Sequence, residues 1–107
     1  MTIAVFTPTE VAQALDAGAE AVKLFPTSTA GPRHLRALRG PFPQLQVIPT
    51  GGIDVGDLHA WFAAGALAIG VGSELVPRSL VQEGQWKEIT HRAERFARAA
   101  EEARAGL

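Results

Sequence analysis

Four short apolar runs alternate along this chain with stretches that have helical spacing. The runs are residues 3–6, 21–25, 46–49 and 67–71, and the expected helices are 8–17, 32–38, 55–64 and 86–105. Runs that are apolar along their length are typical of parallel strands covered by helices. The sequence therefore predicts an α/β protein built from four βα units.

The length of the chain limits how such units can close. A barrel of eight βα units needs about 200 residues or more, whereas this chain has 107. We expect one domain over residues 1–107, with two folds possible: half of a (β/α)8 barrel, or an open doubly wound sheet.

Composition argues against several classes of function. The formal net charge is −1, so no overall field draws the protein to nucleic acid or to an anionic membrane. The absence of cysteine excludes disulfides and fits a cytoplasmic location. The longest apolar stretch, residues 61–71, is broken by glycines and too short to span a bilayer. The three histidines lack the spacing of a metal site, so no metal is expected.

Lys23 is the residue that most strongly suggests chemistry. It lies in the middle of the second apolar run, where a lysine is rare. An ammonium ion there is costly unless it is paired or gives up its proton, and a neutral lysine amine attacks carbonyl carbons. The alternative is a lysine on an edge strand whose charged end reaches solvent. The spacing alone leaves both interpretations open.

Glycine-containing turns follow the third and fourth apolar runs. They are Thr50-Gly51-Gly52 and Gly70-Val71-Gly72-Ser73. Backbone N–H groups at such glycines, with the start of the following helix, suit an anion. Consecutive strand ends of this kind often hold a phosphate in βα barrels. Either turn alone is more often a simple tight turn, but together they favour a phosphate site.

Five stretches of the chain occur in the order and spacing of one enzyme family. They are Phe6-Thr7-Pro8-Thr9-Glu10, Val22-Lys23-Leu24-Phe25-Pro26, residues 35–43, Pro49-Thr50-Gly51-Gly52-Ile53, and Gly72-Ser73 followed by Leu75-Val76-Pro77. Together they resemble the 2-keto-3-deoxy-6-phosphogluconate (KDPG) aldolases and their 4-hydroxy-2-oxoglutarate (KHG) and 6-phosphogalactonate relatives. The resemblance implies the C-terminal (βα)4 half of a TIM-type (β/α)8 barrel.

The resemblance also implies an activity, that of a Schiff-base (class I) aldolase of carbohydrate metabolism. Such an enzyme reversibly cleaves KDPG or KHG to pyruvate and an aldehyde. Lys23 would form the covalent imine, so no cofactor is needed. Thr50 and Phe25 would line the pocket beside the imine. The substrate phosphate would be held by Gly51, Gly52, Gly72 and Ser73. The implied partners are these small molecules and further copies of the chain in a homo-oligomer.

Departures from the family pattern leave alternatives open. The family's acid/base glutamate comes from earlier barrel strands, which this sequence does not contain. The family's Gly-Gly-Ser-Trp loop is here Val71-Gly72-Ser73-Glu74. Residues 28–32 are closer to the galactonate enzymes, and Thr50 is closer to the gluconate enzymes. The alternatives are a phosphogalactonate-type aldolase, an inactive half-barrel with only a phosphate site, and a phosphate-binding barrel isomerase, which the context of Lys23 disfavours.

Overall fold

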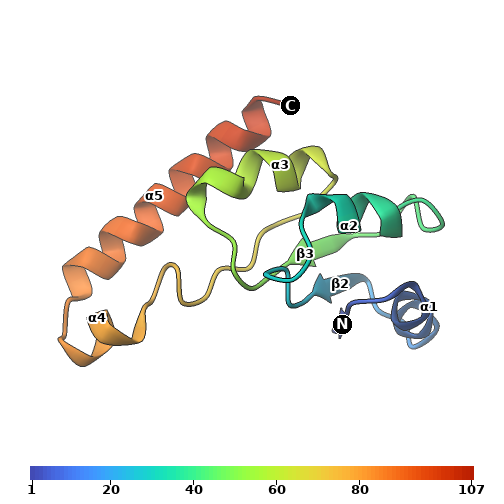
Figure 1. Cartoon of the computed structure of the whole chain (residues 1–107), viewed down its shortest axis with the longest axis horizontal. Helices are drawn as coiled ribbons and strands as arrows, with labels where there is room; N and C mark the ends of the chain where they lie inside the picture. Colours follow the sequence, from blue (N-terminus) through green and yellow to red (C-terminus); the bar gives the residue numbers. More distant parts are fainter.

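The computed structural model describes residues 1–107 and contains a parallel sheet of three strands in the order β1-β2-β3 (Figure 1). The strands are β1 (Thr2–Val5), β2 (Ala21–Leu24) and β3 (Val47–Pro49), and the helices are α1 (Pro8–Asp16), α2 (Pro32–Leu38), the 3₁₀ helix η1 (Val55–Asp57), α3 (Leu58–Ala63), α4 (Arg78–Gln82) and α5 (Trp86–Ala105). The predicted α/β class and the first three strands are confirmed. The short helix α4 is one that the sequence pattern does not indicate.

Capping side chains fix two of the helix starts. The Glu10 carboxylate accepts hydrogen bonds of 3.0 Å from the N–H groups of Phe6 and Thr7, while the Thr7 hydroxyl accepts one from Glu10. This capping box begins α1 where the sequence predicts it. Asp54 and Asp57 form the same arrangement at η1. Both connections from strand to helix are therefore encoded locally.

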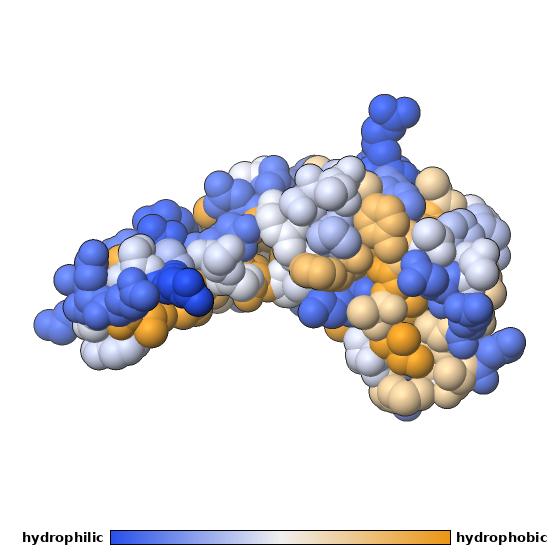
Figure 2. Space-filling model, turned by 60° about the horizontal axis from the view of Figure 1, so that its bottom comes forward, coloured by the Kyte–Doolittle hydropathy of each residue, from blue (hydrophilic) through white to orange (hydrophobic).

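The two faces of the sheet differ in what covers them. Val22 and Leu24 of β2 and Val47 of β3 are fully buried and belong to one core with residues of α1, α2, α3 and α5. On the opposite face Ala4 is exposed and Lys23 is half-buried. Parallel sheets normally have both faces covered. Figure 2 shows the molecule as an arch with a hollow between its two ends.

The expected fourth strand, residues 67–71, is not formed. This segment meets β3 through the N–H groups of Leu67 and Gly70, which donate to the carbonyls of Val47 and Pro49, and through one bridge between Thr50 and Gly70. Pro49 has no N–H to donate in return, and glycine weakens a strand. The sheet therefore holds three strands and a bridge; the fourth strand was predicted wrongly, and the half-barrel is not confirmed.

The long helix α5 lies beside α3 and places Phe96 and Ala103 in the core. It leads away from the sheet toward α4 at the far end of the molecule (Figure 1). Its predicted range, residues 86–105, is confirmed. None of the helices combines the length and hydropathy that crossing a membrane requires.

Candidate active site

The carboxyl ends of the three strands meet at one edge of the sheet. The ladder continues one residue past each end, since the N–H of Phe25 donates to Val5 (3.2 Å) and the N–H of Thr50 donates to Leu24 (2.9 Å). Side chains alternate between faces along a strand. Lys23, Phe25 and Thr50 therefore share the uncovered face, as their predicted common role requires.

Lys23 lies on the central strand, paired with Ala4 on one side and Ile48 on the other. Lys23 is therefore not on an edge strand of this sheet, although its side chain lies on the uncovered face. Its Nζ lies 5.0 Å from the centre of the Phe25 ring, a cation–π arrangement. It forms no ion pair with a carboxylate and no hydrogen bond. The Phe25 ring is thus the one recorded partner of the Lys23 amine.

Phe25 is packed against a glycine of the next loop although 48 % of it is exposed. A Cβ added to Gly51 would lie 3.0 Å from the ring, and Gly51 has a φ of +95°. Only glycine combines this backbone conformation with such a close ring. The structure thus brings Phe25 and Gly51 together beside Lys23.

Thr27 joins the loops after β2 and β3, and sequence reasoning missed it. It is the one buried polar side chain, only 6 % exposed. Its N–H and its hydroxyl both donate to the carbonyl of Thr50, at 3.1 and 3.0 Å, and its hydroxyl also contacts the Gly51 carbonyl. A threonine directly after the lysine motif gives no signal by itself, because its partners are about 24 residues away.

The two predicted phosphate turns lie next to each other. The parallel bridge between Thr50 and Gly70 places Gly51-Gly52 and Gly72-Ser73 just beyond the same point of the sheet edge. The N–H groups of Gly52, Gly72 and Ser73 donate no hydrogen bond within the protein, whereas the bridge directs the N–H of Gly51 toward the carbonyl of Gly70. Unpaired, clustered N–H groups are what an anion-binding loop offers.

The sequence analysis expected the start of the helix after each glycine turn to help bind the anion, and the structure corrects this expectation. The N–H of Val55 donates to the carboxylate of Asp54 at 2.8 Å, and the N–H of Asp54 donates to Asp57 at 3.0 Å. Two carboxylates thus occupy the donors at the start of η1, and their charge opposes a phosphate there. After Ser73 the chain forms a turn rather than a helix. Any anion contact falls to the glycine turns themselves.

His34 contacts the end of β1. It is half-buried, its Nε2 lies 2.6 Å from the carbonyl oxygen of Phe6, and its ring stacks on Phe6 at 4.6 Å. Because a carbonyl only accepts, Nε2 carries the proton. His34 therefore ties the start of α2 to the end of β1 at the site edge. No group of acidic and histidine side chains has metal-binding geometry.

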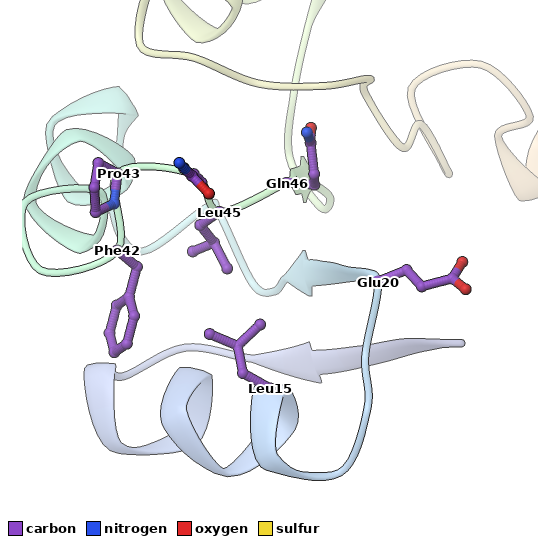
Figure 3. A pocket seen from close by; sticks show the side chains of 7 residues that line it. Leu15, Glu20, Phe42, Pro43, Leu45 and Gln46 are labelled. Atoms are coloured by element: carbon purple, nitrogen blue, oxygen red, sulfur yellow. The ribbon is translucent and has the colours of Figure 1, made fainter.

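A cavity of about 500 Å³ lies at the other edge of the sheet, near the amino ends of β2 and β3. In Figure 3, Leu15, Phe42 and Leu45 turn toward one another while Glu20 points away. Reaction sites of parallel βα folds lie at the carboxyl ends of the strands. No lysine or arginine side chain lines this cavity, and it is not the candidate site.

Comparison with known proteins agrees with this geometry. A family model described as KDPG and KHG aldolase matches residues 1–92. The chain belongs to this aldolase family. The match covers β1 to β3, both glycine turns and Lys23. The resemblance inferred from the five motifs is thereby confirmed.

Two curated members of the aldolase family are similar over most of this chain. A 2-dehydro-3-deoxy-phosphogluconate aldolase of Haemophilus influenzae is 37 % identical over 83 % of this chain and 42 % of its own length. A 2-dehydro-3-deoxy-6-phosphogalactonate aldolase of Escherichia coli is 38 % identical over 91 % of this chain and 46 % of its own length. The chain therefore spans less than half of the length of these two relatives.

A solved structure described as native KDPGal shares the fold. It superimposes with a TM-score of 0.84 at 32 % identity, covering 99 % of this chain and 50 % of that chain. The structural similarity, like the sequence similarity, thus extends over about half of the related protein.

Proposed function

We propose that this chain supplies the Schiff-base half of a class I aldolase that acts on 2-keto-3-deoxy-6-phospho sugar acids. The observation that carries the proposal is the unpaired Lys23 amine at the carboxyl edge of the central strand, beside Phe25 and Thr50. An amine without a carboxylate partner, in a partly apolar setting, is suited to attack a ketone.

In the proposed reaction Lys23 attacks the keto carbon, and loss of water gives a protonated imine. When the C3–C4 bond of the substrate breaks, the imine at C2 accepts its electron pair. The hydroxyl on C4 loses its proton, and C4 leaves as the aldehyde. The resulting enamine takes up a proton at carbon, and water releases pyruvate and the free amine. The covalent lysine replaces a cofactor, and no step requires a metal.

The proton transfers need a base that the Lys23 face does not contain. Its strand residues are apolar or neutral around Lys23, among them Ala4, Ile48 and Thr50, and the nearby Glu10 is engaged in its capping box. We propose that a further βα half covers this face, completes a TIM-type barrel and brings the missing acid/base group. The uncovered sheet face and the half-length match to the relatives support this arrangement.

The phosphate of the substrate is proposed to bind at Gly51, Gly52, Gly72 and Ser73. The support is that the N–H groups of Gly52, Gly72 and Ser73 have no acceptor within the chain, and that the bridge between Thr50 and Gly70 brings the two turns side by side. Thr50 follows β3, two residues beyond Ile48, the partner of Lys23, and directly before Gly51, so it would line the path from phosphate to keto carbon.

A phosphogalactonate-type substrate is the second candidate. The Escherichia coli galactonate enzyme is as similar to this chain as the Haemophilus influenzae gluconate enzyme, at 38 % and 37 % identity. The two sugar acids share the pyruvate half and the phosphate, so the proposed roles hold for both. Initial rates with each epimer distinguish them.

Borohydride trapping tests the proposal, because the chain contains two lysines, Lys23 and Lys87. Pyruvate and borohydride, added to a barrel that carries this half, should leave one reduced adduct on Lys23. Lys23→Met should abolish the adduct while the protein stays folded, since the side chain enters no ion pair or hydrogen bond.

Lys87→Arg is the matched control, because Lys87 is exposed on α5. It should be trapped as the wild type is. An adduct located on Lys87, or one that persists in Lys23→Met, contradicts the assignment.

A further inference from the structure

The Gly72-Ser73 turn depends on more than the sheet for its position. Residues 67–71 form only two hydrogen bonds and one bridge with β3 and its extension. Beyond them, the Gly72 carbonyl accepts hydrogen bonds of 3.0 Å from the N–H groups of Leu75 and Val76. This turn leaves the N–H groups of Gly72 and Ser73 without acceptors. The contacts that fix this turn therefore decide whether the N–H groups of Gly72 and Ser73 stay available to one anion.

Two arginines of α5 bind main-chain carbonyls at the two ends of this segment. Arg92 Nη1 donates to the carbonyl of Glu74 at 2.9 Å, and Arg104 Nη2 donates to that of Leu67 at 2.6 Å. Along the helix the two arginines are separated by about 18 Å. A chain from Leu67 to Glu74 reaches about 25 Å when fully extended. The helix is therefore long enough to act as a brace along the segment.

Apolar packing between α5 and the segment is incomplete. A cavity of about 330 Å³ lies between α3, α5 and residues 68–75, and its lining is apolar except for Arg104. This space is large enough for water, so its apolar lining is not fully buried, and polar contacts contribute more to holding the segment. Arg92 also forms an ion pair with Glu88, whose carboxylate oxygen lies 3.5 Å from Arg92 Nε, although this nitrogen is buried and makes no hydrogen bond.

We propose that Arg92 is a positioning residue of the anion site. Its hydrogen bond to the Glu74 carbonyl fixes the turn after Gly72, so that the N–H groups of Gly72 and Ser73 stay available together to one phosphate. A bond from a charged guanidinium is stronger than one between neutral groups. The inference rests on the phosphate site proposed above and adds to it a residue that does not touch the substrate.

The test titrates inorganic phosphate into the full chain and follows the amide NMR signals of Gly51, Gly52, Gly72 and Ser73. In Arg92→Ala we expect the phosphate Kd to rise about fivefold or more, the effect of losing one hydrogen bond. Arg92→Lys keeps the charge and a donor and should recover most of the affinity. Arg95→Ala is the matched control: Arg95 is exposed on the same helix, forms no hydrogen bond or ion pair, and should leave Kd unchanged.

Amide hydrogen exchange, measured without phosphate, shows whether Arg92 positions the turn or only attracts the anion by its charge. In Arg92→Ala the N–H groups of Leu75 and Val76 should exchange faster because the turn loosens, while Val22 in the central strand keeps its protection. Should Arg92→Ala lose the protection at Val22 as well, the milder Arg92→Gln replaces it in the comparison.

Two outcomes overturn different parts of the argument. A wild-type chain whose four amide signals do not move at any phosphate concentration overturns the phosphate site, and the role of Arg92 with it. A wild-type chain that binds phosphate, while Arg92→Ala binds it equally well, overturns the role of Arg92 alone and leaves the proposed function in place.

Discussion

The side chain of Lys23 lies on the one face of the sheet that no helix covers. Its neighbours Val22 and Leu24 are fully buried on the other face. Because a strand alternates its side chains, burying these two residues turns Lys23 outward. The residue is thus placed by the hydrophobic effect on its neighbours rather than by a polar partner of its own.

Gly70 makes the closest approach to a site residue. A Cβ added there would overlap the Thr50 side chain, with Thr50 Cγ2 at 3.0 Å. We expect Gly70→Ala to lower the free energy of unfolding by about 1–3 kcal/mol, the usual result of overpacking. Urea denaturation measures the change. Gly56→Ala is the control, because nothing lies within 4 Å of its added Cβ, and it should not destabilise the protein.

At the scale of elements, the capping box of α1 makes stability depend on pH. The N–H of Thr7, and then that of Phe6 and the Thr7 hydroxyl, donate to Glu10 and lower the pKa of its carboxyl. A lowered folded-state pKa stabilises the protein above the unfolded-state value, near about 4.3 for glutamate. That stabilisation is lost as the pH falls through the lower folded value.

Glu10→Gln should therefore unfold at a lower temperature than the wild type at neutral pH, and the difference should shrink on acidification. Thermal unfolding followed across the acid range checks this. Glu101→Gln on α5, an exposed carboxylate without an ion pair, is the control and should show no such trend. If the difference in unfolding temperature between the wild type and Glu10→Gln did not change with pH, the charge of Glu10 would not be its cause.

The two glycine turns act as one element because the bridge between Thr50 and Gly70 joins them. If they hold the substrate phosphate, its binding energy also positions the reacting carbon beside Lys23. In a complete barrel carrying this half, substrates without phosphate should therefore show a strongly raised KM. Initial-rate kinetics of KDPG against KHG decide the point. Equal efficiency with KHG would rule out the phosphate assignment.

At the scale of the whole molecule, the sheet is open on one face and at its β1 edge. Unpaired edges and bare faces of parallel sheets favour association. We expect the 107-residue chain to associate at micromolar concentration, as static light scattering would show. A well-folded monomer would contradict the expectation and indicate that the open face is stable in water.

The associated chain should show little or no aldolase turnover, because a second copy repeats Lys23 without adding a base beside it. Full activity from the purified chain would show that one of its own carboxylates transfers the proton. Glu74, directly after the second glycine turn, would be the first to replace.

The sequence by itself determined the elements that local chemistry encodes. The alternation of apolar runs and the capping residues predict three strands and most helices, because period and caps act within a few residues. Five motifs in order, the one around Lys23 among them, indicated the family. The fourth strand was predicted wrongly, since the missing N–H of Pro49 matters only when that strand lies opposite residues 67–71.

Only the tertiary structure decided what lies next to Lys23 and what holds the glycine turns. The contacts of Thr27 with Thr50 and Gly51, and of Arg92 with Glu74, join residues about 18 to 24 positions apart. No period or spacing encodes such pairs, because they depend on how the core brings separate elements together. The open face of the sheet has the same origin: the apolar runs predict a sheet covered on both sides, and the packing within this chain covers one.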